Sequence, residues 1–177
     1  MPGSTVELEP MNMEQVIDDS EHLIDSEELA DLIRAAVANE NTICFNAPGR
    51  SMAPFIQSGD RIFISLVSKA SIRAGDVLAF VHPNTGRVLA HRVVRITGGQ
   101  FFTKGDNVRG EGDGWICFTD VLGRVIRLQR NGSELRLGLG PEKLLIAQLS
   151  RGKILVSLIN FLQRIKWGMK RLFLGWD

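Results

Sequence analysis

A serine stands in a Gly- and Pro-rich turn within the run FNAPGRSMAPFIQSGD, residues 45–60. Ser51 lies between Arg50 and Met52, and a hydrophobic run begins at Arg61. A serine hydroxyl is a weak nucleophile at neutral pH and needs a base within hydrogen-bonding distance to take its proton. A linker or a hydrolase could place a serine in such a turn, so the question is whether the chain supplies a base.

Three histidines are candidates for this base. His22 lies in an acidic segment, where a solvated histidine is the ordinary expectation, and His82 stands in a turn beside Pro83. His91 stands inside the β-type run LAHRVV, and strand alternation places it on the same face as Leu89. A histidine on an apolar strand face is usually a core residue. The position of His91 alone therefore does not identify it as a catalytic base.

A polar segment, TKGDNVRGEGDGW at residues 103–115, supplies carboxylates that could orient an imidazole. Its candidates are Asp106, Glu111 and Asp113, and the segment is too rich in glycine and charge to belong to the core. The alternative is a solvated loop. Gly-Asp pairs favour turns, so Gly59-Asp60, Gly75-Asp76 and Gly105-Asp106 could each serve a turn and nothing more.

The elements that must position these residues change character near residue 40. Residues 25–38 are predicted to be a helix because Leu29, Leu32, Ile33, Ala36 and Val37 recur at helical spacing, and Asp25 and Glu28 have capping-box spacing. From residue 42 short β-type runs alternate with glycine turns. The predicted strands are TICF (42–45), RIFISLV (61–67), DVLAFVH (76–82), VLAHRVVRI (88–96), QFFTK (100–104) and VLGRVIRLQ (121–129). Residues 82–87 predict a hairpin turn, and residues 131–134 predict another tight turn.

The fold class expected from this pattern is mainly β, or α+β overall. We expect an acidic arm and helix at 1–40, a catalytic β domain at 42–138 and a basic amphipathic tail at 141–177. Residues 1–40 hold eleven acidic residues and one basic residue, a net charge of −10, whereas residues 143–177 hold seven basic residues and one acidic residue. The acidic arm would repel DNA, so no nucleic-acid partner is expected.

Composition narrows the remaining classes. The two cysteines fit no metal-ligand spacing, and both Cys44 and Cys117 lie in apolar runs that predict buried free thiols. We expect neither a metal ion nor a cofactor. No secretory signal heads the chain, and no run of about 18 apolar residues is present. These features favour a cytoplasmic or peripheral-membrane location.

The C-terminal tail is predicted to be helical from Pro141, a residue that suits a first helical position. Between residues 152 and 176 one face is apolar, with Ile154, Leu158, Phe161, Ile165, Met169 and Leu172, and the opposite face is basic. Interfacial helices have this composition, so the tail could lie on an anionic membrane surface. The alternative is a helix that packs on its own domain or on a protein partner.

Five segments, taken in order, resemble the type I signal peptidase family: GRSMAPFIQSGD, RAGDVLAFVHP, LAHRVVRI, FFTKGDN and DVLGRV. The resemblance covers residues 45–127. Within the family, the chain resembles in particular the Ser–His branch found in the endoplasmic reticulum, archaea and some spore-forming bacteria. It implies a serine endopeptidase with Ser51 as nucleophile and His91 as base. The larger bacterial branch and the related self-cleaving repressors carry a lysine where His91 stands.

The same resemblance implies further roles. Asp106 matches the carboxylate of the family's Gly-Asp-Asn segment. A second carboxylate is expected downstream and is matched by Asp113, or by Glu111, because the spacing here is one residue longer than the family's. The resemblance also implies a substrate and oxyanion segment around the nucleophile, with Gly49, Arg50 and Met52. The Ser51 backbone N–H would form part of the oxyanion hole.

Similar enzymes bind an extended peptide along a sheet edge and cut after small side chains, as in an A-x-A site. We therefore expect cleavage of a precursor peptide or leader segment. Two alternatives stay open. One is a non-catalytic peptide-binding or scaffolding relative. The other is a self-cleaving regulator, because Ala36-Val37-Ala38 has the A-x-A form. The family usually carries a membrane anchor before its nucleophile, and this chain has an acidic helical arm there instead.

Overall fold

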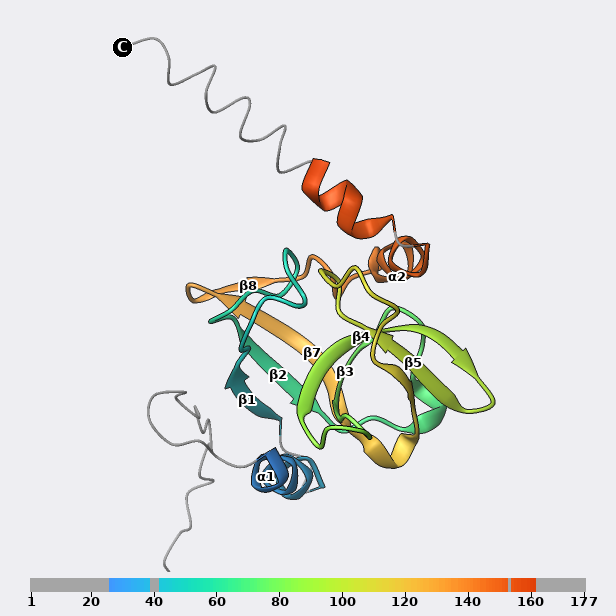
Figure 1. The fold of residues 1–177 in the computed structure, drawn as a ribbon. Coiled ribbons are helices and arrows are strands. Elements are labelled where there is room, and N and C mark those ends of the chain that lie inside the picture. The colour runs from blue at the N-terminus through green and yellow to red at the C-terminus, as the bar shows by residue number, and fades with distance from the viewer. Residues whose placement is uncertain (1–25, 39–41, 153, 162–177) are drawn as a thin grey trace, which may run out of the picture.

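An antiparallel sheet of eight strands forms the body of the protein in the computed structural model, which describes residues 26–38, 42–152 and 154–161 (Figure 1). The strands are β1 (Ile43–Asn46), β2 (Arg61–Ser65), β3 (Val77–Val81), β4 (Val88–Thr97), β5 (Gln100–Lys104), β6 (Gly114–Ile116), β7 (Val121–Arg130) and β8 (Ser133–Leu135). Two α-helices, α1 (Ser26–Ala38) and α2 (Lys143–Arg151), flank the sheet, and two short 3-10 turns, η1 (Lys69–Ser71) and η2 (Phe118–Asp120), connect strands. The expected mainly β, α+β fold class is confirmed.

All six predicted strands are present, and their boundaries agree with the prediction to within two residues. The predicted hairpin joins β3 to β4, with His82 N–H donating to the Arg87 carbonyl across the turn. The second predicted turn joins β7 to β8, and both Asn131 (φ 50°) and Gly132 (φ 77°) adopt the left-handed region. Hairpin turns of two residues favour Asn-Gly for this reason.

Strand β7 is the long central strand. It pairs with β2, β3 and β8, and the sheet order is β1-β2-β7-β3-β4-β5-β6. One apolar cluster lies between α1, β1, β2 and β7 and includes Ile33, Ile62 and Leu128, whereas a second cluster includes Phe80, Val93 and Phe101. The sheet is strongly curved in Figure 1, and α1 contacts β1, β4 and β7. Two strands far apart in the sheet order, β1 and β4, therefore approach one another.

The helix predicted at 25–38 is observed as α1 and is fixed to the body by its apolar stripe. Ala30 and Ile33 are buried in the first apolar cluster, and Leu29 packs against that cluster. Leu32, which the pattern placed in the same stripe, is 39% exposed. The buried stripe is therefore narrower than predicted. Asp25, the expected capping residue, lies outside the described residues.

The tail is helical as far as the structure describes it, but it bends. Helix α2 begins at Lys143, two residues after Pro141, and ends before Gly152. A second helical segment, Leu155–Phe161, follows at an angle of 105°. No single helix among the described residues has the length and hydropathy to cross a membrane, although this bent pair passes by composition when taken together. The predicted helix beyond residue 161 lies outside the described residues.

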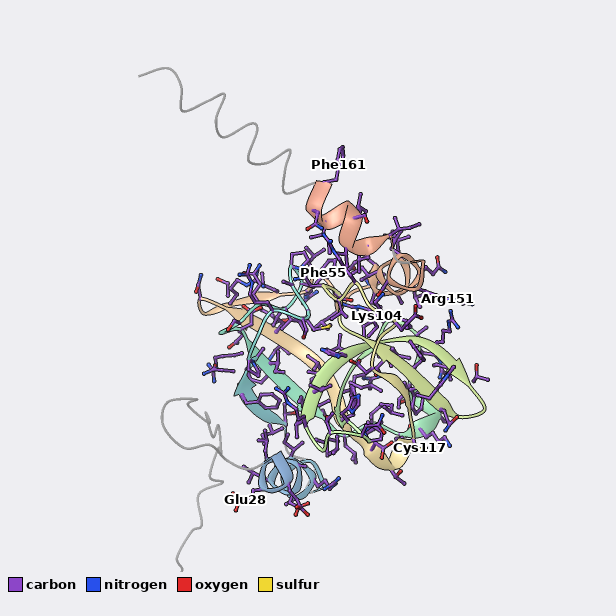
Figure 2. All side chains as sticks on the ribbon, viewed as in Figure 1. Glu28, Phe55, Lys104, Cys117, Arg151 and Phe161 are labelled. Atoms are coloured by element: carbon purple, nitrogen blue, oxygen red, sulfur yellow. The ribbon has the colours of Figure 1, made fainter. Side chains whose placement is uncertain are left out.

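Of the two cysteines predicted to be buried free thiols, Cys44 agrees with the prediction and Cys117 does not. Cys44 is buried and Cys117 is exposed, and neither forms a disulfide. Figure 2 shows Cys117 where the chain leaves β6, outside the sheet interior. Its thiol accepts a hydrogen bond from the Gln100 amide (3.5 Å), and its backbone N–H donates to the Asp120 carboxylate. The apolar run WICF is therefore a short strand followed by a capped turn.

Candidate active site

Three side chains from separate segments form a continuous hydrogen-bonded chain. His91, on β4, lies with Nε2 2.8 Å from Ser51 Oγ and Nδ1 2.7 Å from Asp113 Oδ2. The His91 and Asp113 side chains are 7% and 13% exposed. A carboxylate can only accept, so Nδ1 carries the proton and Nε2 is left to accept from the serine hydroxyl. This arrangement gives Ser51 the adjacent base that a serine nucleophile requires.

Asn107 forms hydrogen bonds with the turn that carries Ser51. The Asn107 backbone N–H donates to the Ser51 carbonyl (2.7 Å), and its side-chain amide donates to the Arg50 carbonyl (3.2 Å). Within the turn, Ala53 N–H also donates to the Arg50 carbonyl. The Gly-Asp-Asn segment therefore positions the nucleophile through backbone groups. No pattern in the sequence marks Asn107 as a site residue, although it directly follows Asp106 in the Gly-Asp-Asn segment.

Gly105 lies against the serine–histidine pair. A Cβ atom at this position would lie 2.8 Å from the Ser51 carbonyl oxygen and 3.2 Å from His91 Nε2. The first distance is too short for a side chain, so a residue without one is required here. The sequence offered turn chemistry as the reason for this glycine, whereas the structure shows close packing against the site.

Asp113 lies directly before β6, a strand that was not among the six predicted. Its backbone N–H donates to the Thr103 carbonyl (2.9 Å), immediately before β6 pairs with β5. The preceding Gly112 has φ +108°, and a Cβ there would lie 2.7 Å from the same carbonyl oxygen. Glu111, the alternative carboxylate, is exposed, and the contact with the imidazole is made by Asp113.

Asp106 contacts an arginine rather than the imidazole. Its two carboxylate oxygens accept hydrogen bonds from Arg92 Nε (2.8 Å) and Nη2 (2.7 Å), and both side chains are 0% exposed. Burial raises the pKa of the Asp106 carboxyl, and the Arg92 guanidinium opposes that rise. The sequence had offered Asp106 as a carboxylate for His91. The structure places it behind the site, bound to the neighbour of His91 on β4.

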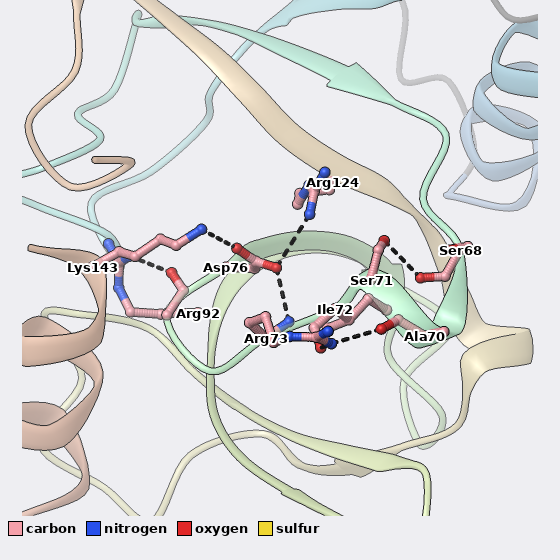
Figure 3. A network of polar contacts seen from close by, with 10 residues as sticks. Ser68, Ala70, Ser71, Ile72, Arg73, Asp76, Arg92, Arg124 and Lys143 are labelled. Carbon is pink, nitrogen blue, oxygen red and sulfur yellow. Dashed lines mark hydrogen bonds and ion pairs between the residues drawn. The ribbon is translucent and has the colours of Figure 1, made fainter. Parts of the chain in front are cut away.

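Arg92 also joins distant segments. Its Nη1 donates to the Gly75 carbonyl (2.8 Å) and the Gly138 carbonyl (2.7 Å). Figure 3 shows this arginine beside a second ion group, in which the buried Asp76 binds Lys143 of α2 and Arg124 of β7. Strand β4, the turn before β3 and the segment leading to α2 are thereby fixed around the site.

An apolar pocket of about 150 Å³ opens beside Ser51. One wall is the end of β1 and the chain after it, including Gly49, and the other is Val88–His91 at the start of β4. Met52 is buried and lines the pocket. Gly49 has φ +76° and no atom near the position of a Cβ. Arg50 is exposed and does not line the pocket, so its observed part in the site is its backbone carbonyl.

Leu29 of α1, Gln57 and Ile62 are among the lining residues that the sequence did not single out as site residues. Of the other two histidines, His82 accepts a hydrogen bond from Asn84 N–H in the β3–β4 turn, and His22 lies outside the described residues. Within the described part of the chain, no cluster of three His, Cys, Asp or Glu side chains is placed to hold a metal ion.

Comparison with known proteins identifies a family and several similar proteins. A family model described as "Peptidase S24-like" matches residues 4–111, more than half of the chain. The chain belongs to the peptidase S24-like family. Members of the signal peptidase group are also similar to it. The signal peptidase complex catalytic subunit SEC11C of Homo sapiens, and the proteins of that name from Mus musculus and Canis lupus familiaris, are each 35% identical over 87 residues.

These alignments cover 42% of this chain and 45% of each relative. The S24-like chain therefore spans about half the length of the curated relatives it matches. Together the family match and the relatives place it in the type I signal peptidase and S24 superfamily, as the ordered segments predicted. The chain is accordingly grouped with S24-like and signal-peptidase-type proteins.

Proposed function

We propose that this S24-like protein is a serine endopeptidase that cleaves a precursor peptide or leader segment after small residues. The observation that carries the proposal is the Ser51–His91–Asp113 chain, with contacts of 2.8 and 2.7 Å. A nucleophile bonded to a base, and a base bonded to an orienting acid, is the arrangement by which serine hydrolases are recognised on unrelated folds.

The mechanism is acyl transfer through a covalent intermediate. Ser51 Oγ attacks the scissile carbonyl carbon while His91 Nε2 takes the hydroxyl proton. Asp113 holds the Nδ1 proton in place and stabilises the imidazolium. His91 then gives its proton to the leaving amine, the C–N bond breaks, and an acyl-serine remains. Water, deprotonated by His91, attacks that ester and restores the free Ser51 hydroxyl.

The oxyanion that forms during attack needs preorganised donors. Ser51 begins a tight turn whose next residues bond back to earlier carbonyls, as Ala53 N–H does to Arg50. We assign the Ser51 backbone N–H as one donor. Gly49 has no side chain to offer a second one, so a second donor would come from the backbone.

The pocket beside Ser51 suits an extended peptide. In the described structure β1 pairs with β2 alone, and residues 88–90 of β4 pair with β3 alone. The outer edges of both segments are therefore free to bind a peptide backbone. The pocket volume is similar to that of an apolar cavity that holds one benzene molecule. It suits small aliphatic side chains, in agreement with cleavage after small residues.

Two other functions fit the structure less well. A non-catalytic peptide-binding relative would have no need of the complete serine–histidine–aspartate chain. A self-cleaving regulator would have to present Ala36-Val37-Ala38 to its own Ser51. These residues lie inside α1, and Ala36 packs against the apolar core, so the end of the helix would have to unwind first.

Active-site labelling tests the proposal directly. A fluorophosphonate probe is expected to label the purified full chain, and labelling should be lost in Ser51→Ala and His91→Ala. Ser58→Ala is the matched control, because Ser58 is exposed in the same loop and should leave labelling intact. Cleavage of a peptide library, read by mass spectrometry, should occur after small residues. Equal labelling of wild type and Ser51→Ala would contradict the proposal, and peptide binding without labelling would favour the non-catalytic alternative.

We propose further that the tail brings the site to an anionic membrane surface. Leu144 and Leu145 of α2 are more than half exposed, and so are Ile154 and Phe161 of the following segment. In Figure 2, Phe161 points away from the body. Residues 151–171 carry six Lys or Arg and no acidic residue. Each such charge near an anionic surface contributes about 1 kcal/mol.

The other face of this segment is anchored on the domain. Leu155 and Ile159 are buried against Ile146 of α2, and Phe55 of the nucleophile loop packs against the same cluster. The structure therefore satisfies one apolar face internally and leaves a second one exposed. The alternative, in which the tail packs on its own domain, explains the buried apolar face. The exposed apolar face has no partner among the described residues.

Co-sedimentation with vesicles tests this. The full chain should bind vesicles that contain phosphatidylserine, more weakly at high salt, and Phe161→Asp should weaken binding. Ile126→Asp is the matched control, because Ile126 of β7 is 48% exposed and lies outside the tail. Equal binding to neutral vesicles, or equal loss in both variants, would favour a protein partner instead.

A further inference from the structure

Helix α1 reaches into the pocket that opens beside Ser51. Leu29 lines that pocket together with residues of β1 and β4. Figure 1 shows α1 beside the start of β1, whereas Ser51 follows its end, so the helix lies toward the side of the pocket away from the nucleophile. The helix is thus part of the pocket's boundary.

The core holds this boundary in place. Ala30, next to Leu29, is 2% exposed, and Ile33, one turn later, is 0% exposed. Both belong to the apolar cluster that contains Ile62, and Ile62 also lines the pocket. Moving α1 away would expose these side chains, at about 1.5–3 kcal/mol for each large one. The core therefore holds Leu29 in a fixed position in the wall of the pocket.

We propose that Leu29 of α1 is a specificity-determining residue that limits the size of a substrate side chain bound in this pocket. The proposal rests on the peptidase function proposed above and adds a residue from outside the β domain to its substrate site. An extended peptide between β1 and β4 points alternate side chains into the pocket. Because Leu29 lies away from Ser51, the side chain it limits is not the one next to the scissile bond.

The size of the effect follows from how pockets discriminate. One methylene more or less in an apolar pocket changes kcat/KM about 10–200-fold. Leu29→Ala removes three carbons from the wall. It should raise kcat/KM for peptides with Leu or Phe, relative to Ala, by about tenfold or more at one position on the acyl side. Leu29→Phe should shift the same ratio in the opposite direction.

The test is a set of peptides in which each of the three residues before the scissile bond is varied in turn. Leu29→Met keeps the side-chain volume and should retain the wild-type profile. Leu32→Ala is the matched control, because Leu32 is on the same helix, is 39% exposed and does not line the pocket. Thermal unfolding of each variant checks that α1 remains folded. If Leu29→Ala unfolds, Leu29→Phe still tests the wall.

Peptide binding to a Ser51→Ala background, measured by fluorescence anisotropy, separates this proposal from the catalytic one. If the wild type cleaves no peptide but the binding preference changes with Leu29, the peptidase function fails and the wall is supported. If the wild type cleaves but Leu29→Ala and Leu29→Phe both keep its profile, the wall is refuted and the peptidase function stands.

Discussion

Two aspartates near the site should respond differently when each is changed to asparagine. Asp113→Asn should lower activity, whereas Asp106→Asn should lower stability. Asp113 accepts one hydrogen bond, from His91, and is partly exposed. Asp113→Asn leaves the packing intact but can hold the imidazole in the wrong tautomer. In serine proteases the corresponding change lowers kcat about 10⁴-fold, which is about 5 kcal/mol of transition-state stabilisation. The folded protein should keep its unfolding temperature to within about 2 °C, because little buried structure is lost.

Asp106→Asn should instead destabilise the fold. It removes the countercharge of Arg92, which is fully buried and donates two hydrogen bonds to Asp106. Breaking one partner of a buried ion pair costs about 3–5 kcal/mol. For a chain of this size each kcal/mol lowers the unfolding temperature by about 2–4 °C. We therefore expect a loss on the order of 10 °C, with turnover per folded molecule reduced much less than in Asp113→Asn.

Both variants are measured by steady-state cleavage of one peptide at a temperature where each is folded, and by circular dichroism melting. Normalising kcat to the folded fraction separates the two effects. A silent Asp113→Asn together with a stable but inactive Asp106→Asn would refute this assignment and would make Asp106 the carboxylate that serves the imidazole.

Two further changes test how the turns serve the site. Gly105→Ala should abolish turnover, because its Cβ would lie 2.8 Å from the Ser51 carbonyl oxygen; Gly110→Ala, where the nearest atom is 3.9 Å away, should be tolerated, and equal activity of the two would contradict the packing argument. Asp60→Asn should cost about 1.5–3 kcal/mol of stability by weakening two charged hydrogen bonds with Arg130, while kcat of the folded enzyme stays unchanged. A lowered kcat at full folding would show that this pair, too, positions the site.

Much of the fold followed from local pattern. Six strands, α1 and two hairpin turns were predictable because apolar alternation, helical spacing and Asn-Gly chemistry act over a few residues. Strands β6 and β8 were not among the predicted strands, because each has only three residues, too few for apolar alternation to be recognised. The bend after α2 was not predicted either, because the apolar pattern of residues 152–176 indicates a helix that begins at Gly152.

The sequence indicated which segments contribute to the site, but not which of their side chains contact one another. Ser51 and His91 came from the order of the segments, and neither spacing nor charge could choose between Asp106 and Asp113. That choice depends on Arg92. Strand alternation places Arg92 on the face opposite His91, but nothing in the sequence indicates that Arg92 binds Asp106. A buried arginine requires a carboxylate, and Asp106 is the one it binds. Asp113 makes the contact with His91. Leu29 was assigned to the core alone, because a helical stripe does not reveal that one of its members lines a pocket.

The Gly-Asp pairs at residues 59–60, 75–76 and 105–106 show how one local motif can serve turns and long-range packing together. At residues 59–60 and 75–76 the aspartate closes a turn by accepting a backbone N–H three residues earlier, from Gln57 (2.6 Å) and Arg73 (2.9 Å). All three aspartates, Asp60, Asp76 and Asp106, are nevertheless at most 3% exposed. A buried carboxylate is costly unless it is paired, and turn chemistry alone does not explain that burial.

Each of these aspartates binds a cation from a distant element. Asp60 binds Arg130 at the end of β7, Asp76 binds Lys143 of α2, and Asp106 binds Arg92 of β4. The sheet has open edges at β1 and β6, so strand pairing alone does not fix how it curls. Three ion pairs, each with a buried carboxylate and each joining a turn to a remote segment, supply that constraint. The pair nearest His91 brings the Gly-Asp-Asn segment against β4, and Asn107 in turn holds the carbonyl of Ser51. This ion pair contacts neither reacting atom, yet it helps to hold the turn that carries the nucleophile against the strand that carries the base.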